Sequence, residues 1–265
     1  MNPPRHRLHG RKDSRQRNRQ DRHDTRRHPP LDIVILYGWH PVKAALQNPA
    51  RRFRRLLATE NALRRLDEDK VRLPLKPELV RPGQIDAELG PDAVHQGLLA
   101  EAEPLPSPGL DTLPTDGVVL LLDQITDPHN VGAILRSAAA FNARAVVTTA
   151  RHSPEATGVL AKSASGALEV VPIVLVQNLA RAMEELRSNA FLLVGLDSEA
   201  DADLGALKLR APLALVLGAE GKGLRLLTRA TCDHVARIEL PGAIASLNVS
   251  NAAAVALYVA TRGLG

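Results

Sequence analysis

The feature that most constrains the fold is a series of short, uninterrupted apolar runs in the C-terminal half of the chain. The runs at 118–122, 145–148, 170–174, 191–194, 213–217 and 235–240 each have the length of a strand. Helical patterns lie between them at 131–141, 157–163, 179–187 and 249–262. Strands without polar alternation are typical of a parallel sheet that is covered on both faces. We therefore predict an α/β domain with a parallel sheet over residues 117–265.

Composition narrows the class of protein further. Hydrophobic residues make up 45% of the chain but aromatic residues only 2%, so the core must consist of Ala, Val, Leu and Ile. No apolar run is long enough to span a bilayer, and the polar N-terminus does not resemble a signal peptide. Cys232 is the only cysteine, which excludes an internal disulfide and a cluster of thiol metal ligands. We expect a cytoplasmic protein without a metal and without a membrane role.

Three regions precede the predicted sheet domain. A basic tail covers residues 1–30, and a small α/β unit covers 31–103, with expected strands at 33–36, 51–57 and 94–100 and expected helices at 42–47 and 61–70. The strand at 51–57 has a basic face. Residues 104–116 contain four prolines, so neither a helix nor a sheet can continue through them. We expect this segment to be the linker between two domains.

The tail carries all of the basic excess of the chain. It holds ten Arg or Lys residues against three acids, whereas the net charge of the whole chain is +5. With almost no apolar residues, it cannot offset the entropy of folding on its own. It is either an electrostatic arm for a polyanion such as RNA or a solvated extension. A targeting peptide is less favoured, because the tail contains acids.

The first polar segment in the sheet domain spans residues 123–138, where a strand ends and a helix begins. Asn130 lies where an N-cap is expected. Arg136 follows six residues later in a helix otherwise made of small and apolar residues, and taken alone it would be a solvent-facing residue. His129 and, in the small unit, His95 are tempting proton acceptors, but a structural role is the simpler interpretation.

The second segment spans residues 215–224 and places Gly218, Gly221 and Gly223 directly after an apolar strand. Glycines allow close approach of the backbone to a ligand, or a positive φ. The pattern is neither a P-loop nor a dinucleotide fingerprint. A tight turn with Glu220 exposed would also explain it.

The third segment spans residues 238–254. Ser246, Asn248, Ser250 and Asn251 crowd the start of one helix. A single N-cap explains one of them, so four short polar residues exceed what capping needs.

Taken in this order, the three segments closely resemble the signature motifs of the SpoU-type (TrmH-like) RNA 2′-O-ribose methyltransferases of the SPOUT superfamily. The resemblance covers residues 117–265 and reaches the small unit through 37–42 and 94–97. The layout is most similar to the subgroup that methylates a guanosine ribose in 23S rRNA.

The resemblance implies a C-terminal parallel-sheet domain with a deep trefoil knot. It also implies a preceding α/β RNA-binding domain similar to small ribosomal proteins that bind RNA kinks. The implied cofactor is S-adenosylmethionine, held by loops around Gly218, Ile238 and Leu247. The implied partners are RNA and a second copy of the chain, since the family works as homodimers.

The family's functional residues correspond to Asn130, Arg136, Glu220, Ser246 and Asn248. Arg136 is the residue usually assigned to activating the 2′-hydroxyl, but a guanidinium is always protonated. We therefore expect Arg136 to bind the adjacent phosphate and to stabilise the developing alkoxide. Glu220 and Asn130 are expected to orient Arg136, and Ser246 and Asn248 to hold the ribose and the cofactor loop.

Two other functions stay open at this point. One is the same chemistry on tRNA or at another rRNA position. The other is an RNA-binding ribosome-assembly factor without activity. The five polar residues favour an enzyme, and the small N-terminal unit favours rRNA.

Overall fold

The computed structural model describes residues 33–151, 158–244 and 246–264. The basic tail and the expected helix start at 157 lie outside the described residues. Residues Asp32–Gly265 form one compact unit that contains two sheets.

The first sheet has four strands in the order β1-β4-β2-β3: β1 (Val34–Tyr37), β2 (Phe53–Ala58), β3 (Glu78–Leu79) and β4 (Leu98–Ala102). β4 is antiparallel to both β1 and β2, whereas β2 and β3 are parallel. The connections contain the helices α1 (Trp39–Gln47), α2 (Glu60–Glu68) and α3 (Pro82–Leu89). Strands and helices therefore alternate in this part of the chain.

This sheet has a core on each face because successive side chains of a strand point to opposite sides. Leu56 of β2 is fully buried in a cluster with Trp39 of α1. Its neighbour Leu57 belongs to a second cluster with Ile85 of α3. The three helices thus cover both faces of the sheet.

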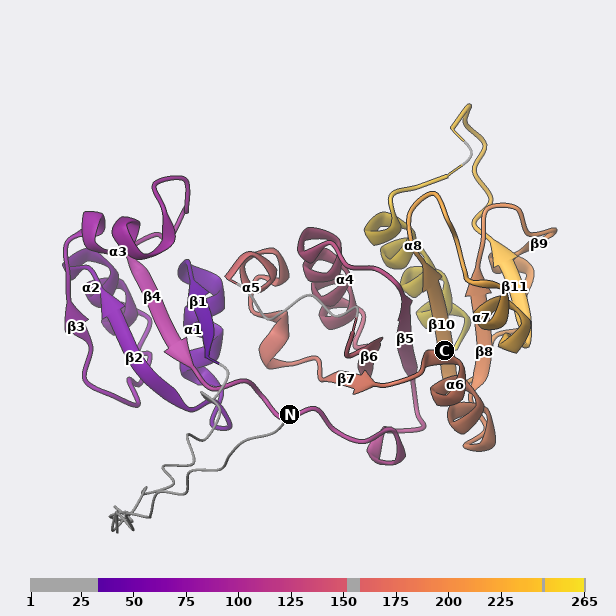
Figure 1. Cartoon of the computed structure of the whole chain (residues 1–265), viewed down its shortest axis with the longest axis horizontal. Coiled ribbons are helices and arrows are strands. Elements are labelled where there is room, and N and C mark those ends of the chain that lie inside the picture. The colour runs from indigo at the N-terminus through magenta and orange to yellow at the C-terminus, as the bar shows by residue number, and fades with distance from the viewer. Residues whose placement is uncertain (1–32, 152–157, 245, 265) are drawn as a thin grey trace, which may run out of the picture. The chain divides into compact units, whose positions relative to one another are not determined.

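The second sheet has seven parallel strands in the order β7-β6-β5-β10-β8-β11-β9. They are β5 (Val118–Asp123), β6 (Ala145–Thr149), β7 (Ile173–Val176), β8 (Leu192–Leu196), β9 (Ala202–Asp203), β10 (Leu213–Gly218) and β11 (His234–Arg237). Figure 1 shows β10 between β5 and β8, although about ninety residues of chain separate β5 from β10. The prediction of a parallel sheet is confirmed.

Helices cover both faces of this sheet (Figure 1). They are α4 (Pro128–Ala140), α5 (Gly158–Ala164), α6 (Leu179–Ser188), α7 (Leu226–Thr231) and α8 (Val249–Gly263). Leu120 of β5 is packed in a cluster with Leu257 of α8, and Leu121 in another with Met183 of α6. Because the strands are parallel, their carboxyl ends lie at the same edge of the sheet. The loops after β5, β8 and β10 therefore lie side by side.

For three strands, one predicted end differs clearly from the structure. β4 begins only at Leu98, because Gln96 and Gly97 have φ values of 53° and 81°, which a strand does not accommodate. β7 begins at Ile173, since the preceding chain forms a 3₁₀ turn at Ala167–Glu169. β11 ends at Arg237, so residues 238–240 form a loop instead of strand. The sequence also gave no indication of α3, α7, β3 or β9.

Two of the basic side chains around β2, Arg51 and Arg55, are paired with acids, whereas Arg52 and Arg54 are exposed. Arg55 contacts Glu78, Glu88 and Glu101, and hydrogen bonding to Glu78 together with the charge of Glu88 raises the pKa of its guanidinium. Arg51 is buried and pairs with Glu169, at 2.6 Å between Nη2 and Oε1 and 3.1 Å between Nε and Oε2. The two paired arginines act within the fold.

Candidate functional site

The first polar segment connects β5 to α4. Asp127 is the N-cap of α4, because its Oδ1 accepts a hydrogen bond of 3.0 Å from the backbone N–H of His129. The expectation that Asn130 is the N-cap was wrong, since Pro128 occupies the first position of the helix and already fixes its start. Asn130 lies in the first turn, where its Oδ1 accepts a bond of 3.0 Å from Asn248 Nδ2.

Arg136 lies on the exposed side of α4. Within the described ranges Arg136 makes no hydrogen bond and no ion pair. Glu220 and Asn130, which were expected to orient it, contact Asn248 instead. On the helix, residue 136 shares a face with residue 129, seven positions earlier. His129 Nδ1 lies 3.3 Å from Ser163 Oγ of α5, a contact that supports its structural interpretation.

The second polar segment is a tight loop after β10. Gly218 pairs with Asp123 in the sheet, and the backbone N–H of Gly223 donates back to Ala219 O at 2.9 Å. A Cβ at Gly218 would overlap the backbone of Gly223, so this position requires glycine. Gly223 has a φ of 62°, which favours glycine as well.

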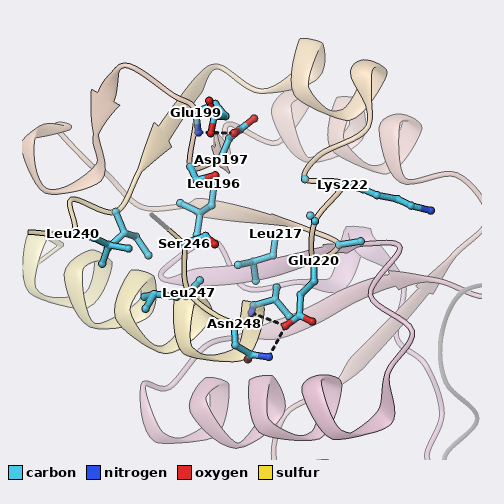
Figure 2. Close-up of a pocket in the computed structure, with 18 residues that line it drawn as sticks. Leu196, Asp197, Glu199, Leu217, Glu220, Lys222, Leu240, Ser246, Leu247 and Asn248 are labelled. Atoms are coloured by element: carbon cyan, nitrogen blue, oxygen red, sulfur yellow. Dashed lines mark hydrogen bonds between the residues drawn. The ribbon is translucent and has the colours of Figure 1, made fainter. Parts of the chain in front are cut away.

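Asn248 joins the three segments. It is the N-cap of α8, and its Oδ1 accepts a bond of 2.9 Å from the N–H of Ser250. Its Nδ2 donates to Asn130 Oδ1 and to Glu220 Oε1. Glu220 Oε1 also accepts a bond of 3.3 Å from the N–H of Val249. Figure 2 shows Glu220 and Asn248 facing each other at the edge of the cavity. The structure thus brings together Asn130, Glu220 and Asn248, but not Arg136.

A cavity of about 590 Å³ opens beside this cluster. Its walls come from residues 196–199 at the end of β8, 217–223 at the end of β10, Ile238 and Leu240 after β11, and residues 246–249 with Ala252 at the start of α8. All three residues expected to bind the cofactor, Gly218, Ile238 and Leu247, line it, and so does Ser246. Figure 2 shows Lys222 pointing away from it.

Sequence reasoning missed the wall at residues 196–199. Asp197 and Glu199 lie there, directly after the apolar strand β8. The available signal was their position, because ligands in parallel sheets bind beyond the carboxyl ends of the strands. Elsewhere, no group of three metal-ligating side chains occurs in the described part of the chain.

Comparisons with known protein families agree with the fold. Residues 117–258 match the SpoU rRNA Methylase family, and residues 35–108 match the family described as RNA 2′-O ribose methyltransferase substrate binding. The 23S rRNA (guanosine-2′-O-)-methyltransferase RlmB of Pseudomonas aeruginosa is 41% identical over 84% of this chain and 94% of its own length. The Escherichia coli protein of the same name is 38% identical over 86% of this chain and 98% of its own.

A solved structure shows the same arrangement. The SpoU methyltransferase AviRb from Streptomyces viridochromogenes, in complex with AdoMet, matches with a TM-score of 0.72 and 28% identity, over 86% of this chain and 89% of its own. Fold, site and matches together define an RNA methyltransferase that uses S-adenosylmethionine. The chain belongs to the SpoU rRNA methylase family.

The cavity fits this cofactor. Its volume lies in the range of small-molecule sites, roughly 300–1,000 Å³. Leu217, Ile238 and Leu247 supply apolar surface, as a nucleobase requires. Glu199 supplies an exposed carboxylate, which suits a ligand that carries an ammonium and a sulfonium group. None of the helices in the described residues has both the length and the apolar character that crossing a membrane requires.

Proposed function

We propose that the protein methylates the ribose 2′-hydroxyl of a guanosine in 23S rRNA. The observation that carries the proposal is the extent of the match to relatives with that name. They align over 84–87% of this chain and at least 94% of their own length, so the match includes the small N-terminal sheet. A substrate of this kind implies that the protein acts in the cytoplasm.

S-adenosylmethionine, when bound, supplies an activated methyl group. The protein must then align the ribose hydroxyl with that group and stabilise the charge that develops as the hydroxyl loses its proton. We assign backbone contacts with the cofactor to Gly218, Ile238 and Leu247, because all three line the cavity.

Arg136 is proposed to hold the phosphate beside the target ribose and to stabilise the developing alkoxide. Its exposure, and the lack of an ion pair within the described residues, leave the guanidinium available for an RNA phosphate. The cluster of Asn130, Glu220 and Asn248 is proposed to fix the loops around the reacting hydroxyl, and Ser246 to contact the ribose.

The Arg136→Lys variant tests the role of the forked guanidinium. We expect it to retain cofactor affinity and to lose most of kcat, because lysine cannot bind a phosphate in a bidentate manner. Near-normal activity would show that a point charge suffices.

We propose that residues 31–103 are the RNA-binding domain, similar to small ribosomal proteins, that residues 104–116 are its linker, and that residues 1–30 are a further electrostatic contact. The match of residues 35–108 to a substrate-binding family supports the first assignment. Arg51 and Arg55 are paired with acids, so we assign phosphate contacts around β2 to the exposed Arg52 and Arg54.

A homodimer and a deep trefoil knot are further parts of this proposal. Val255 and Tyr258 of α8 are partly exposed apolar side chains, which a second copy would cover. Light scattering after size exclusion tests the dimer: a monomer at micromolar concentration would contradict it. The structural likeness to AviRb supports the knot.

A tRNA substrate is the second candidate. A structure described as "Structural insights into the 2-OH methylation of C/U34 on tRNA" matches with a TM-score of 0.51, but it covers only 56% of this chain. The full-length match to 23S rRNA enzymes therefore favours rRNA. The third candidate, a ribosome-assembly factor without activity, is opposed by the intact set of five polar residues.

Mapping of ribose methylation decides among these candidates. Sequencing of alkali-fragmented rRNA and tRNA from cells with and without the gene is expected to show the loss of one mark in 23S rRNA. Restoration by the parent gene but not by Asn248→Ala would tie the mark to this site. A lost tRNA mark would support the second candidate, and an unchanged map would contradict the enzyme.

A further inference from the structure

The short helix α7 follows the glycine loop of the cavity, and two arginines lie at its start and within it. Arg225 is its N-cap residue, and Arg229 lies one turn later. Neither was singled out in the sequence, and neither lines the cavity itself. Each nevertheless contacts an aspartate at the carboxyl end of a strand next to β10, and one of these, Asp197, lines the cavity.

Arg225 binds Asp123 through two groups. Its backbone N–H donates to Oδ2 at 3.0 Å and its Nε to Oδ1 at 2.6 Å. The side chain of Asp123 is 0% exposed, whereas that of Arg225 is 45% exposed. A buried carboxylate with both oxygens bound holds its partner in one place, because either bond lost would leave a buried charge unsatisfied.

Arg229 binds Asp197 on the other side of β10 through a single side-chain contact. Its Nη1 pairs with Oδ2 of Asp197, which is only 17% exposed. Asp197 Oδ1 accepts a bond of 2.9 Å from the N–H of Glu199, as Figure 2 shows. Asp197 and Glu199 form the wall of the cavity after β8.

The two aspartates lie on opposite sides of β10. Asp123 is the last residue of β5 and Asp197 follows β8, and β10 is the strand between them. Helix α7 therefore connects the two neighbours of β10 at the edge where the glycine loop at 218–223 leaves the sheet. Gly221 and Gly223 give this loop many alternative conformations in the absence of such restraints.

We propose that Arg225 and Arg229 are positioning residues, and that α7 acts as a brace between β5 and β8. The brace holds the glycine loop and the 196–199 wall at the separation that the cofactor cavity requires. The brace preorganises the cavity in the cofactor-free protein. This raises the affinity for the cofactor, because the loops that line the cavity lose less conformational freedom on binding. The inference rests on the cofactor and is independent of which RNA is methylated.

Two variants test the brace. Asp123→Asn keeps the shape of the side chain and an acceptor for the Arg225 N–H, but removes the ion pair; Arg229→Gln breaks the second contact from a side chain that is 40% exposed. We expect each to raise the Kd for S-adenosylhomocysteine about tenfold in titration calorimetry, as loss of one charged hydrogen bond predicts. Arg225→Lys retains the cation and should have a smaller effect.

Amide hydrogen exchange gives a readout without cofactor. In both variants the amides of residues 219–224 should exchange faster than in the parent, whereas those in the middle of β5 should not. In turnover, KM for S-adenosylmethionine should rise by the same factor as Kd, with kcat at saturating cofactor close to that of the parent.

Asp116→Asn is the matched control. It breaks the ion pair of Asp116 with Arg144, at 2.9 Å, beyond the opposite end of β5. It should change neither the Kd nor the exchange of the loop. A Kd within twofold of the parent for Arg229→Gln, or unchanged exchange at 219–224 in either variant, would overturn the proposal. If Asp123→Asn does not fold, Arg229→Gln alone decides.

Discussion

Asn248 provides the sharpest test of the site, because one side chain makes two separable contributions. Its Oδ1 caps α8, and its Nδ2 binds Glu220 and Asn130. An N-cap contributes about 1 kcal/mol. A hydrogen bond to a carboxylate contributes about 1.5–3 kcal/mol, and we take about 1 kcal/mol here because both partners are exposed. Asn248→Ala should therefore lower the free energy of unfolding by about 2 kcal/mol.

Two further variants separate the contributions. Asn248→Ser keeps a capping oxygen and loses the amide, so the loss should fall to about 1 kcal/mol. Asn248→Asp also keeps the cap but places a second carboxylate against Glu220. Two charges at about 4 Å repel by about 1 kcal/mol in water, so the total loss should return to about 2 kcal/mol.

Urea unfolding of cofactor-free protein at low and at high salt measures these differences. Salt at about 1 M shortens the screening length to about 3 Å, so it should relieve part of the penalty of Asn248→Asp and leave that of Asn248→Ala unchanged. The reasoning fails if Asn248→Asp is as stable as the parent at low salt. It also fails if Asn248→Ala and Asn248→Ser are equally unstable.

Three other substitutions or treatments have outcomes fixed by the structure. Glu169→Ala leaves the buried Arg51 without its partner and should cost about 3–5 kcal/mol in urea unfolding; a loss below 1 kcal/mol would contradict the burial of this pair. Burial raises the pKa of Cys232 to about 12, so little of its thiol is ionised at pH 8. Iodoacetamide should therefore label the folded protein slowly and the urea-unfolded protein fast. Equal labelling rates would contradict the burial of this thiol. Gly218→Ala forces Cβ against the backbone of Gly223; we expect a stability loss of about 1–3 kcal/mol and no measurable cofactor binding in calorimetry, and unchanged binding would show that the loop can move.

The central strands of the large sheet could be predicted from the sequence because each is an unbroken apolar run. The run at 170–174 predicted too early a start for β7, because Val170 is apolar yet 70% exposed in the turn before this strand. Helix α7 was not predicted because its leucines, Leu226 and Leu227, are exposed and its buried residues are threonines, so its six residues show no apolar stripe. Short elements carry too few residues for a periodic pattern.

At the site, residue types could be predicted but their contacts could not. Asn130 was expected to cap a helix and to orient Arg136, whereas it contacts Asn248, 118 positions further along the chain. The earlier pair Asp127 and Pro128 was the stronger start signal. The brace of α7 depends on strand order, which places β10 between β5 and β8 and which the sequence does not reveal.

The position of β10 in the sheet also bears on how the protein is made. When β5 leaves the ribosome, its partner β10 has yet to be synthesised. The strand β8 likewise has no partner until β10 follows it. Pairing over such long separations is slow and leaves strand edges open in the meantime. Asn248 is translated later still, so a nascent chain has no complete cofactor site until α8 is being made. Methylation is therefore expected only from chains in which α8 has been synthesised.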